Sequence, residues 1–195
     1  LDAAVQALIA RGYEALTHKL DMRREEDVAA LKAKIDSGLV VDVLVNNAGV
    51  FLEKPGHGSM LQTSPTIAVT TMATNAIGPM RLIQAVLPSM TQRGWGRIVN
   101  VSSGMASLND MGTGAIAYRM SKAALNVITR VTGLEAQGTG VLVNAVCPGW
   151  VRTEMGGPSA TREIVEGVAS IIWAALLPDD GPTAGFFRDG QPIPW

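Results

Sequence analysis

The sequence predicts a single α/β domain built on a doubly wound parallel sheet. Two observations lead to this prediction. Helix-type and strand-type hydrophobic patterns alternate along the chain, and the strand-type runs are rich in valine, which is typical of strands covered on both faces. Such alternation favours parallel strands joined by right-handed crossovers. The 195 residues are enough for one domain of this kind, spanning 1–195, and leave no room for a second.

The first part of the chain is expected to supply two helices and two strands. A helix-type pattern over 2–12 ends at a glycine, and a short strand is expected over 15–20. A helix charged on one side is expected over 23–35. The near-continuous valine and leucine run over 39–45 predicts a buried strand.

The same alternation continues to the C-terminus. Ser64 followed by Pro65 predicts a helix start, because serine caps helices and proline is tolerated in the first turn. The expected elements are helices over 64–92, 115–136 and 161–177 and strands over 97–101, 141–146 and 185–187.

Charge and composition exclude several classes of function. Sixteen Lys and Arg against seventeen Asp and Glu give a net charge of −1, so no basic field attracts nucleic acid or an anionic membrane. The single cysteine, Cys147, excludes an internal disulfide and cysteine-rich metal sites, and two histidines give no basis for zinc chemistry. No apolar run reaches the roughly 20 residues that span a bilayer. We expect a cytoplasmic protein that needs no metal.

In a parallel α/β sheet, ligands bind beyond the carboxyl ends of the strands. Asn46-Asn47-Ala48-Gly49 follows the strand at 39–45, where small residues let a flat or anionic ligand approach the backbone and asparagine amides can brace neighbouring strands. A simple turn is an equally good explanation of this tetrapeptide alone. Ser102-Ser103-Gly104 follows the strand at 97–101, and its hydroxyls can bind a substrate oxygen or cap a helix. Gly-x-Ser-x-Gly is absent, which argues against a serine nucleophile.

Tyr118 and Lys122 are spaced for one face of the helix expected at 115–136, because residues at i and i+4 are neighbours on a helix. A free phenol titrates near 10, which is too high for proton exchange at neutral pH, and a neighbouring cation lowers that pKa. The pair can therefore act as a general acid and base on a carbonyl or an alcohol. Alone, Tyr-x-x-x-Lys is common on solvated helices, and the position after the serine strand gives it weight.

Five motifs in this order resemble the short-chain dehydrogenase/reductase family, and the resemblance extends from Leu20-Asp21 to the C-terminus. They are Asn46-Asn47-Ala48-Gly49, Asn75, Arg97-Ile98-Val99-Asn100-Val101-Ser102-Ser103, Tyr118-Arg119-Met120-Ser121-Lys122 and Cys147-Pro148-Gly149-Trp150-Val151-Arg152-Thr153. Each motif is weak alone, and the ordered set is specific. The stretch 147–155 and the tail through 176–178 look most like carbonyl reductases. The resemblance implies a Rossmann-like fold.

The resemblance implies four catalytic residues. Tyr118 would give a proton to the carbonyl oxygen, or remove it from the alcohol in the reverse direction. Lys122 would lower the pKa of the tyrosine and hold the nicotinamide ribose. Ser103 would bind the substrate oxygen, and Asn75 would fix a water that completes a proton relay.

The resemblance also implies a nicotinamide cofactor, with NADP(H) favoured and NAD(H) as the alternative. Besides Tyr118 and Lys122, the matching cofactor positions are Asp21 and Met22 at the adenine, Asn47, Ala48 and Gly49 on the adenosine side, and Pro148, Gly149, Val151 and Thr153 at the nicotinamide. Met105, Trp150 and Met155 fall where carbonyl reductases line an apolar substrate pocket, and core packing is the alternative for them.

The sequence departs from the family pattern in two places. The family begins with a strand, a glycine-rich turn that seats the pyrophosphate at a helix N-terminus, and a second strand, and no such glycine-rich turn precedes Asn46. We therefore expect a piece of a longer enzyme whose strand at 39–45 has an exposed edge. The link between Ser103 and Tyr118 is also short. It leaves helix faces open, which favours a homodimer or homotetramer, with an amphipathic monomer as the alternative.

The leading functional hypothesis is an oxidoreductase that transfers hydride between a nicotinamide cofactor and a ketone, an aldehyde or a secondary alcohol, most closely a carbonyl reductase. One alternative is a non-catalytic family fragment that keeps the helix-pairing interface and binds no dinucleotide. Another is a dehydratase or epimerase that uses the same tyrosine and lysine. Small-molecule substrates are expected in the first and third cases.

Overall fold

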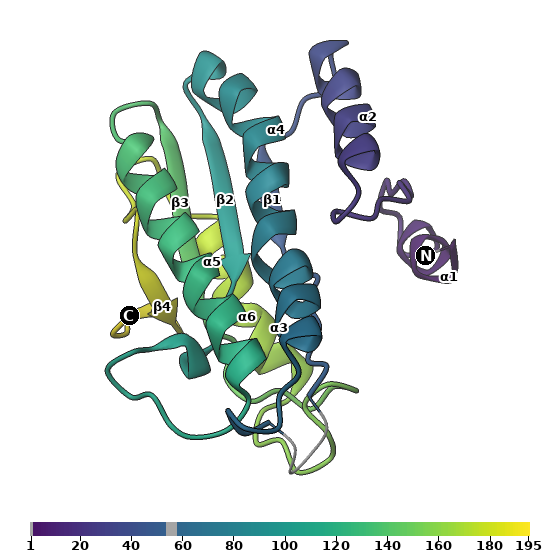
Figure 1. Cartoon of the computed structure of the whole chain (residues 1–195). Helices are drawn as coiled ribbons and strands as arrows, with labels where there is room; N and C mark the ends of the chain where they lie inside the picture. The colour runs from purple at the N-terminus through teal and green to yellow at the C-terminus, as the bar shows by residue number, and fades with distance from the viewer. Residues whose placement is uncertain (1, 54–57) are drawn as a thin grey trace.

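The computed structural model describes residues 2–53 and 58–195, which form an α/β domain around one five-stranded sheet (Figure 1). The strands are β1 (Val43–Asn46), β2 (Gly96–Val101), β3 (Val141–Val146), β4 (Phe186–Arg188) and β5 (Gln191–Pro192), in that spatial order. The pairs from β1 to β4 are parallel, and β5 returns antiparallel to β4. The predicted α/β class with a mostly parallel sheet is confirmed.

Helices cover both faces of the sheet (Figure 1). On one face lie α4 (Gly78–Arg93) and α5 (Ile116–Glu135), and on the other lies α6 (Ile164–Ala175). Helix α2 (Glu25–Asp36) packs beside α4, and its Val28 and Ile35 join the apolar cluster beneath α4. This layered arrangement buries β2 and β3 along their entire lengths.

The long helix expected over 64–92 forms in three parts. It begins at α3 (Pro65–Met72), where the Ser64 side chain accepts a hydrogen bond from the Thr66 N–H (3.2 Å), as the predicted cap requires. It passes through a π-helical turn, η1 (Ala73–Ile77), and continues as α4. Such turns are rare and often lie at functional sites. The hydrophobic pattern gave no sign of the π-turn.

The strand expected over 15–20 is wrong, because this segment forms no ladder with the sheet. The preceding helix, α1 (Asp2–Ile9), buries none of its residues and lies apart from the sheet in Figure 1. A strand needs a hydrogen-bonding neighbour, and among the described residues β1 has a partner on only one side.

The expected strand at 39–45 is confirmed over Val43–Asn46, but its coverage is incomplete. Val43 and Val45 keep 37% and 40% of their surface exposed, so the prediction of two covered faces is wrong. The prediction of an exposed edge is confirmed, because β1 pairs with β2 alone among the described strands.

Within 2–53 and 58–195, no helix is long and apolar enough to cross a membrane. The cytoplasmic location stays a prediction.

Candidate active site

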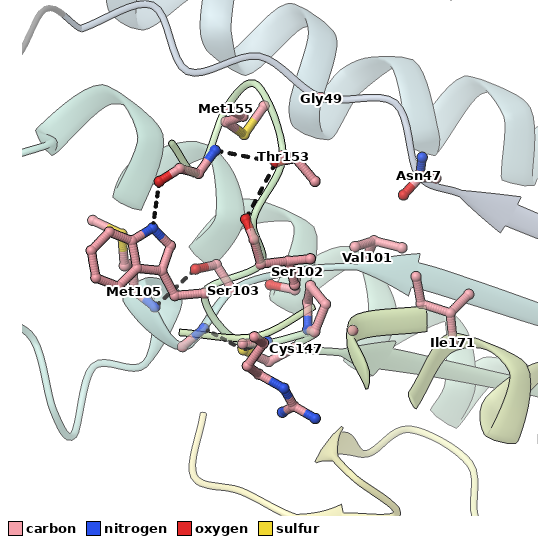
Figure 2. Close-up of a pocket in the computed structure, with 18 of the residues that line it drawn as sticks. Asn47, Gly49, Val101, Ser102, Ser103, Met105, Cys147, Thr153, Met155 and Ile171 are labelled. Carbon is pink, nitrogen blue, oxygen red and sulfur yellow. Dashed lines mark hydrogen bonds between the residues drawn. The ribbon is translucent and has the colours of Figure 1, made fainter. Parts of the chain in front are cut away.

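A cavity of about 1060 Å³ opens at the carboxyl ends of β2 and β3 (Figure 2). Its walls come from the loops after β1, β2 and β3, from the first turns of α5 and from α6. The sequence-predicted residues that line it are Asn47, Ala48, Gly49, Ser103, Met105, Tyr118, Lys122, Pro148, Gly149, Trp150, Val151, Thr153 and Met155. Most of the candidate site is therefore brought together in one place.

Helix α5 is fastened to the end of β2 by a polar stripe at helical spacing. The Lys122 ammonium donates to the Val101 carbonyl (2.8 Å), and Ser102 Oγ donates to Asn126 Oδ1 (2.6 Å). One turn further along, Thr129 Oγ1 accepts from the Asn100 amide (2.8 Å). Positions 122, 126 and 129 share a face. This stripe fixes the rotation of the helix that carries Tyr118.

Tyr118 presents its phenol to the cavity beside the hydroxyl of Ser103. Burial raises the pKa of the phenol above its ordinary value, a hydrogen bond with Ser103 partly offsets this, and the nearby Cys147 sulfur raises it further. The ring packs against Phe51, with the ring centroids 4.8 Å apart. At neutral pH the tyrosine is therefore a protonated group placed next to a second hydroxyl.

Lys122 lies one turn from Tyr118 on the same face, as predicted, with its ammonium 5.8 Å from the centroid of the tyrosine ring. Burial lowers the pKa of the lysine to about 8. Burial dominates the pKa of Tyr118 in this structure and raises it. The lowering of that pKa by Lys122 stays a prediction.

Asn75 lies in the π-turn η1 and is fully buried. Its Oδ1 accepts from the Val50 N–H (2.8 Å), and its Nδ2 donates to the Val50 carbonyl (2.9 Å) and to Ser121 Oγ (3.0 Å). The amide thus joins the loop after β1 to helix α5. The predicted water relay through Asn75 stays a prediction.

Ser103 takes the capping role that the sequence offered as one alternative, and binding of a substrate oxygen by its hydroxyl stays a prediction. Its Oγ accepts from the Met105 N–H (3.2 Å), which caps the short 3-10 turn η2 (Gly104–Ala106). The same side chain faces the cavity with Tyr118 and lowers the pKa of its phenol. The cap fixes the serine rotamer, so the hydroxyl stays directed toward the phenol.

The loop after β1 forms a wall with little side-chain bulk. Asn46 braces β1 against β2 through a hydrogen bond from its Nδ2 to Asn100 Oδ1 (2.8 Å), which confirms the predicted bracing role of an asparagine amide. At Gly49, a β-carbon would lie 3.4 Å from both Asn75 Oδ1 and Lys122 Nζ. A larger side chain there would fill the space in front of the lysine.

The loop after β3 forms the opposite wall, and hydrogen bonds within it maintain its shape (Figure 2). The indole N–H of Trp150 donates to the Gly156 carbonyl (2.8 Å), and the Gly156 N–H donates to Thr153 Oγ1 (3.1 Å). Trp150 and Met155 keep 52% and 49% of their surface exposed. Core packing is therefore excluded for these two side chains, which lie where a ligand can reach them.

Asp21 and Met22 do not line this cavity. The Asp21 carboxylate accepts a hydrogen bond from Arg23 Nη2 (2.6 Å), and this pairing lowers its pKa to about 2. Met22 packs on α4, where a β-carbon at Gly78 would lie 2.4 Å from its sulfur. The adenine contacts of Asp21 and Met22 stay a prediction.

The sequence analysis missed two polar side chains of the site. The guanidinium of Arg188 lies 3.1 Å from the Cys147 sulfur, at the end of β4, whereas the sequence gave no sign of a cation near that thiol. Glu53 is buried and accepts hydrogen bonds from the first turn of α5. Glu53 could have been found from its place in the sequence, because it is an acidic residue within five positions of the Asn-Asn-Ala-Gly motif. Arg188 could have been found as a charged residue next to the strand predicted over 185–187.

Comparisons with known proteins agree with this geometry. A family model described as short chain dehydrogenase matches residues 1–163. Carbonyl reductase (NADPH) 1 of Bos taurus is 31% identical over 244 aligned positions, which cover 99% of this chain and 84% of that protein. The C-signal protein of Myxococcus xanthus is 38% identical over 166 positions, which cover 80% of this chain and 93% of that protein.

Solved structures show the same similarity in three dimensions. The NADPH-bound carbonyl reductase from chicken fatty liver superposes with a TM-score of 0.86 at 26% identity, over 99% of this chain and 82% of that one. A short-chain dehydrogenase/reductase from Burkholderia multivorans with bound NADP gives a TM-score of 0.85 at 31% identity, over 100% of this chain and 82% of that one.

Proposed function

Since the chain belongs to the short-chain dehydrogenase family, we propose that it is an NADP(H)-dependent carbonyl reductase acting on small ketones or aldehydes. The observation that carries the proposal is the buried, protonated Tyr118, which lies beside the Ser103 hydroxyl and one turn from the Lys122 ammonium in a single cavity. A protonated phenol can give the proton that reduction of a carbonyl needs, and the nearby Lys122 ammonium would lower the cost of forming the phenolate.

The residues of the cavity fit the nicotinamide end of the cofactor. Gly49 leaves open the space in front of Lys122, whose ammonium can reach ribose hydroxyls there. Gly149 has φ of 79°, and a β-carbon at that position would lie 2.5 Å from Arg162 Cδ, so the loop adopts this backbone and packs against Arg162 only because no side chain is present. Val151 and Thr153 line the same wall. The NADP(H)-containing relatives support this choice of cofactor.

NADPH supplies the hydride, and the chain supplies the placement and the proton. The hydroxyls of Ser103 and Tyr118 bind the carbonyl oxygen and polarise it. Tyr118 gives its proton to that oxygen as negative charge develops there, and the Lys122 ammonium stabilises the phenolate that remains. Because burial lowers the pKa of Lys122 only to about 8, this ammonium is present at neutral pH.

The exposed wall of the cavity supports a proposal about the substrate class. Met105, Trp150 and Met155 provide adaptable apolar contacts beside the hydroxyl pair. We propose that this wall selects carbonyl compounds with an apolar substituent.

The experiment is titration of the 195-residue chain with NADPH by calorimetry, followed by turnover on a panel of apolar ketones with NADPH consumption and alcohol formation measured together. The proposal predicts micromolar binding and one alcohol per NADPH. A folded chain that binds no NADPH would favour the non-catalytic alternative, which the intact residue set does not support. Substrate conversion without net NADPH consumption would indicate the epimerase or dehydratase alternative.

The outer faces of α3 and α5 support a proposal about the oligomeric state. Val69, Val127 and Val131 are exposed there, with 69%, 63% and 47% of their surface accessible. We propose that two copies pair through this face, as the short link between Ser103 and Tyr118 allows. Sedimentation of the purified chain should give a dimer or tetramer, and a monomer at micromolar concentration would reject this arrangement.

A further inference from the structure

The helix that carries Tyr118 begins without a cap of its own. The residue that precedes it, Ala115, has a left-handed backbone (φ 52°, ψ 41°) and a methyl side chain that accepts no hydrogen bond. The first N–H groups of a helix have no partner within the helix, and leaving them unsatisfied when buried is costly. The start of α5 must therefore be held by another part of the chain.

Glu53 holds it from the loop after β1. One carboxylate oxygen accepts from the Ala117 N–H (2.9 Å) and the other from the Tyr118 N–H (3.0 Å). The side chain is buried, with 7% of its surface exposed. The Ile116 N–H donates to the Gly58 carbonyl (3.2 Å), so the first three N–H groups of α5 are all satisfied by this distant loop. A carboxylate also interacts favourably with the positive end of the helix dipole.

The same loop is joined to the catalytic residues at two further points. Asn75 holds both backbone polar groups of Val50, and the Phe51 ring packs on the Tyr118 ring. Gly49, directly before them, forms the open wall in front of Lys122. The segment from Gly49 to Glu53 thus runs without interruption from the proposed cofactor wall to the backbone of Tyr118.

We propose that Glu53 is a positioning residue for the reaction: by capping α5 through both carboxylate oxygens, it sets the position of the Tyr118 phenol relative to Ser103 and to the wall at Gly49. Glu53 touches the Tyr118 backbone and acts only through it. The inference rests on the proposed function for its kinetic consequences, but its structural part can be measured without cofactor or substrate.

Glu53→Gln is the primary variant, because glutamine keeps the shape and retains one acceptor oxygen while its NH₂ group faces an N–H donor. Glu26→Gln, the same change in the first turn of α2 and far from the cavity, is the matched control. Amide hydrogen exchange of the segment 115–122 should become faster in Glu53→Gln and stay unchanged in Glu26→Gln.

In turnover, Glu53→Gln should lower kcat about 10-fold with a smaller change in the KM for the ketone, since displacement of a catalytic group by a fraction of an ångström has effects of this size. The pH dependence of turnover is a second measurement, and a general loss of stability would not shift it. A weaker Ser103 contact raises the pKa of Tyr118, so the acidic limb of alcohol oxidation should shift to higher pH.

Two results for Glu53→Gln would overturn the inference. The first is unchanged amide hydrogen exchange at 115–122. The second is faster exchange with wild-type kcat and a wild-type pH profile, because Glu53 would then be only a structural cap. If Glu53→Gln fails to fold, Thr63→Val provides the test. It removes only the hydroxyl that donates to Glu53 Oε1 (3.3 Å) and should lower kcat about 3-fold with the same pH shift, and wild-type kinetics in it would reject the inference. A wild-type chain that lacks carbonyl reduction but shows the exchange effect would contradict the proposed function and leave the capping geometry supported.

Discussion

The two walls of the cavity are built differently. The wall at α5 is buried and fastened to the rest of the fold: Lys122 bonds to β2, Tyr118 packs on Phe51, and Asn75 connects the loop after β1 to the helix. The wall after β3 is half exposed, and the hydrogen bonds of Trp150 run within its own loop. In the proposed function, the groups that exchange a proton therefore lie on the buried wall, whereas the groups that contact the substituent lie on the half-exposed loop.

This difference has an energetic basis. Proton transfer needs donor and acceptor within hydrogen-bond reach, and small displacements reduce the rate steeply. Apolar contact is proportional to buried area and tolerates displacement. Changes at the α5 wall should therefore act on kcat, and changes at the loop after β3 should act on KM.

The largest effect is expected at Tyr118. Tyr118→Phe removes the proton donor and keeps the ring that packs on Phe51, so turnover should fall about 10²- to 10⁴-fold with NADPH affinity retained. Steady-state kinetics and calorimetry measure the two quantities. Near-normal turnover in this variant would break the assignment of the α5 wall to proton transfer.

The burial of Lys122 should make the free energy of unfolding depend on pH. Its pKa is lowered from 10.5 to about 8, so between these values the unfolded chain binds more protons than the folded one. The contribution of Lys122 to the free energy of unfolding therefore rises with pH in this window, by about 3 kcal/mol in total.

Denaturant unfolding of the wild type and of Lys122→Met from pH 7 to pH 10.5 measures this contribution. The wild type should gain stability relative to the variant as the pH rises, because methionine carries no titrating group. Parallel stability curves would mean that the ammonium is hydrated rather than buried.

The next largest effect on turnover is expected at Ser103. Ser103→Ala removes the hydroxyl that we propose binds the carbonyl oxygen. The same hydroxyl lowers the pKa of Tyr118 in the wild type, so kcat should fall about 10²-fold in the variant. Ser107→Ala is the matched control, since that serine is also buried and bonds to the Trp195 carbonyl outside the cavity. If the two variants had equal kinetics, the proposed role of Ser103 in the reaction would be rejected.

The smallest effect is expected on the exposed wall. Trp150→Ala should raise KM for bulky apolar ketones about 10-fold with little change in kcat, because only apolar contact is lost. Trp95→Ala provides the control, since Trp95 packs over Arg97 away from the cavity. A large loss of kcat in Trp150→Ala would erase the distinction between the two walls.

The sequence predicted most of this arrangement because the signals that determine it are local. The spacing of Tyr118 and Lys122 on one helix, the serines at the end of a buried strand, and the Ser64-Pro65 helix start each depend on a few neighbouring residues. These elements form close to their predicted bounds. Their convergence on one cavity follows from the parallel sheet, which places all the strand ends on the same side.

The failures come from partners that are distant in sequence. The segment at 15–20 carries a strand pattern but has no neighbour to pair with. Val43 and Val45 lie on one face of β1 and stay half exposed because little packs over them there. Glu53 caps a helix whose first turn begins more than sixty positions later, which no local pattern encodes. The pKa of Tyr118 also depends on burial, and the sequence shows only that a cation lies one turn away.

The central claim is that burial holds Tyr118 as a protonated acid, and titration of tyrosinate absorbance tests it most directly. The chain has two tyrosines, Tyr13 and Tyr118, so subtracting the titration of Tyr118→Phe from that of the wild type isolates the phenol of the cavity. The account predicts that this difference curve has its midpoint above the ordinary value of about 10. A midpoint near or below neutral pH would contradict it, because Tyr118 would then be a phenolate with no proton to give.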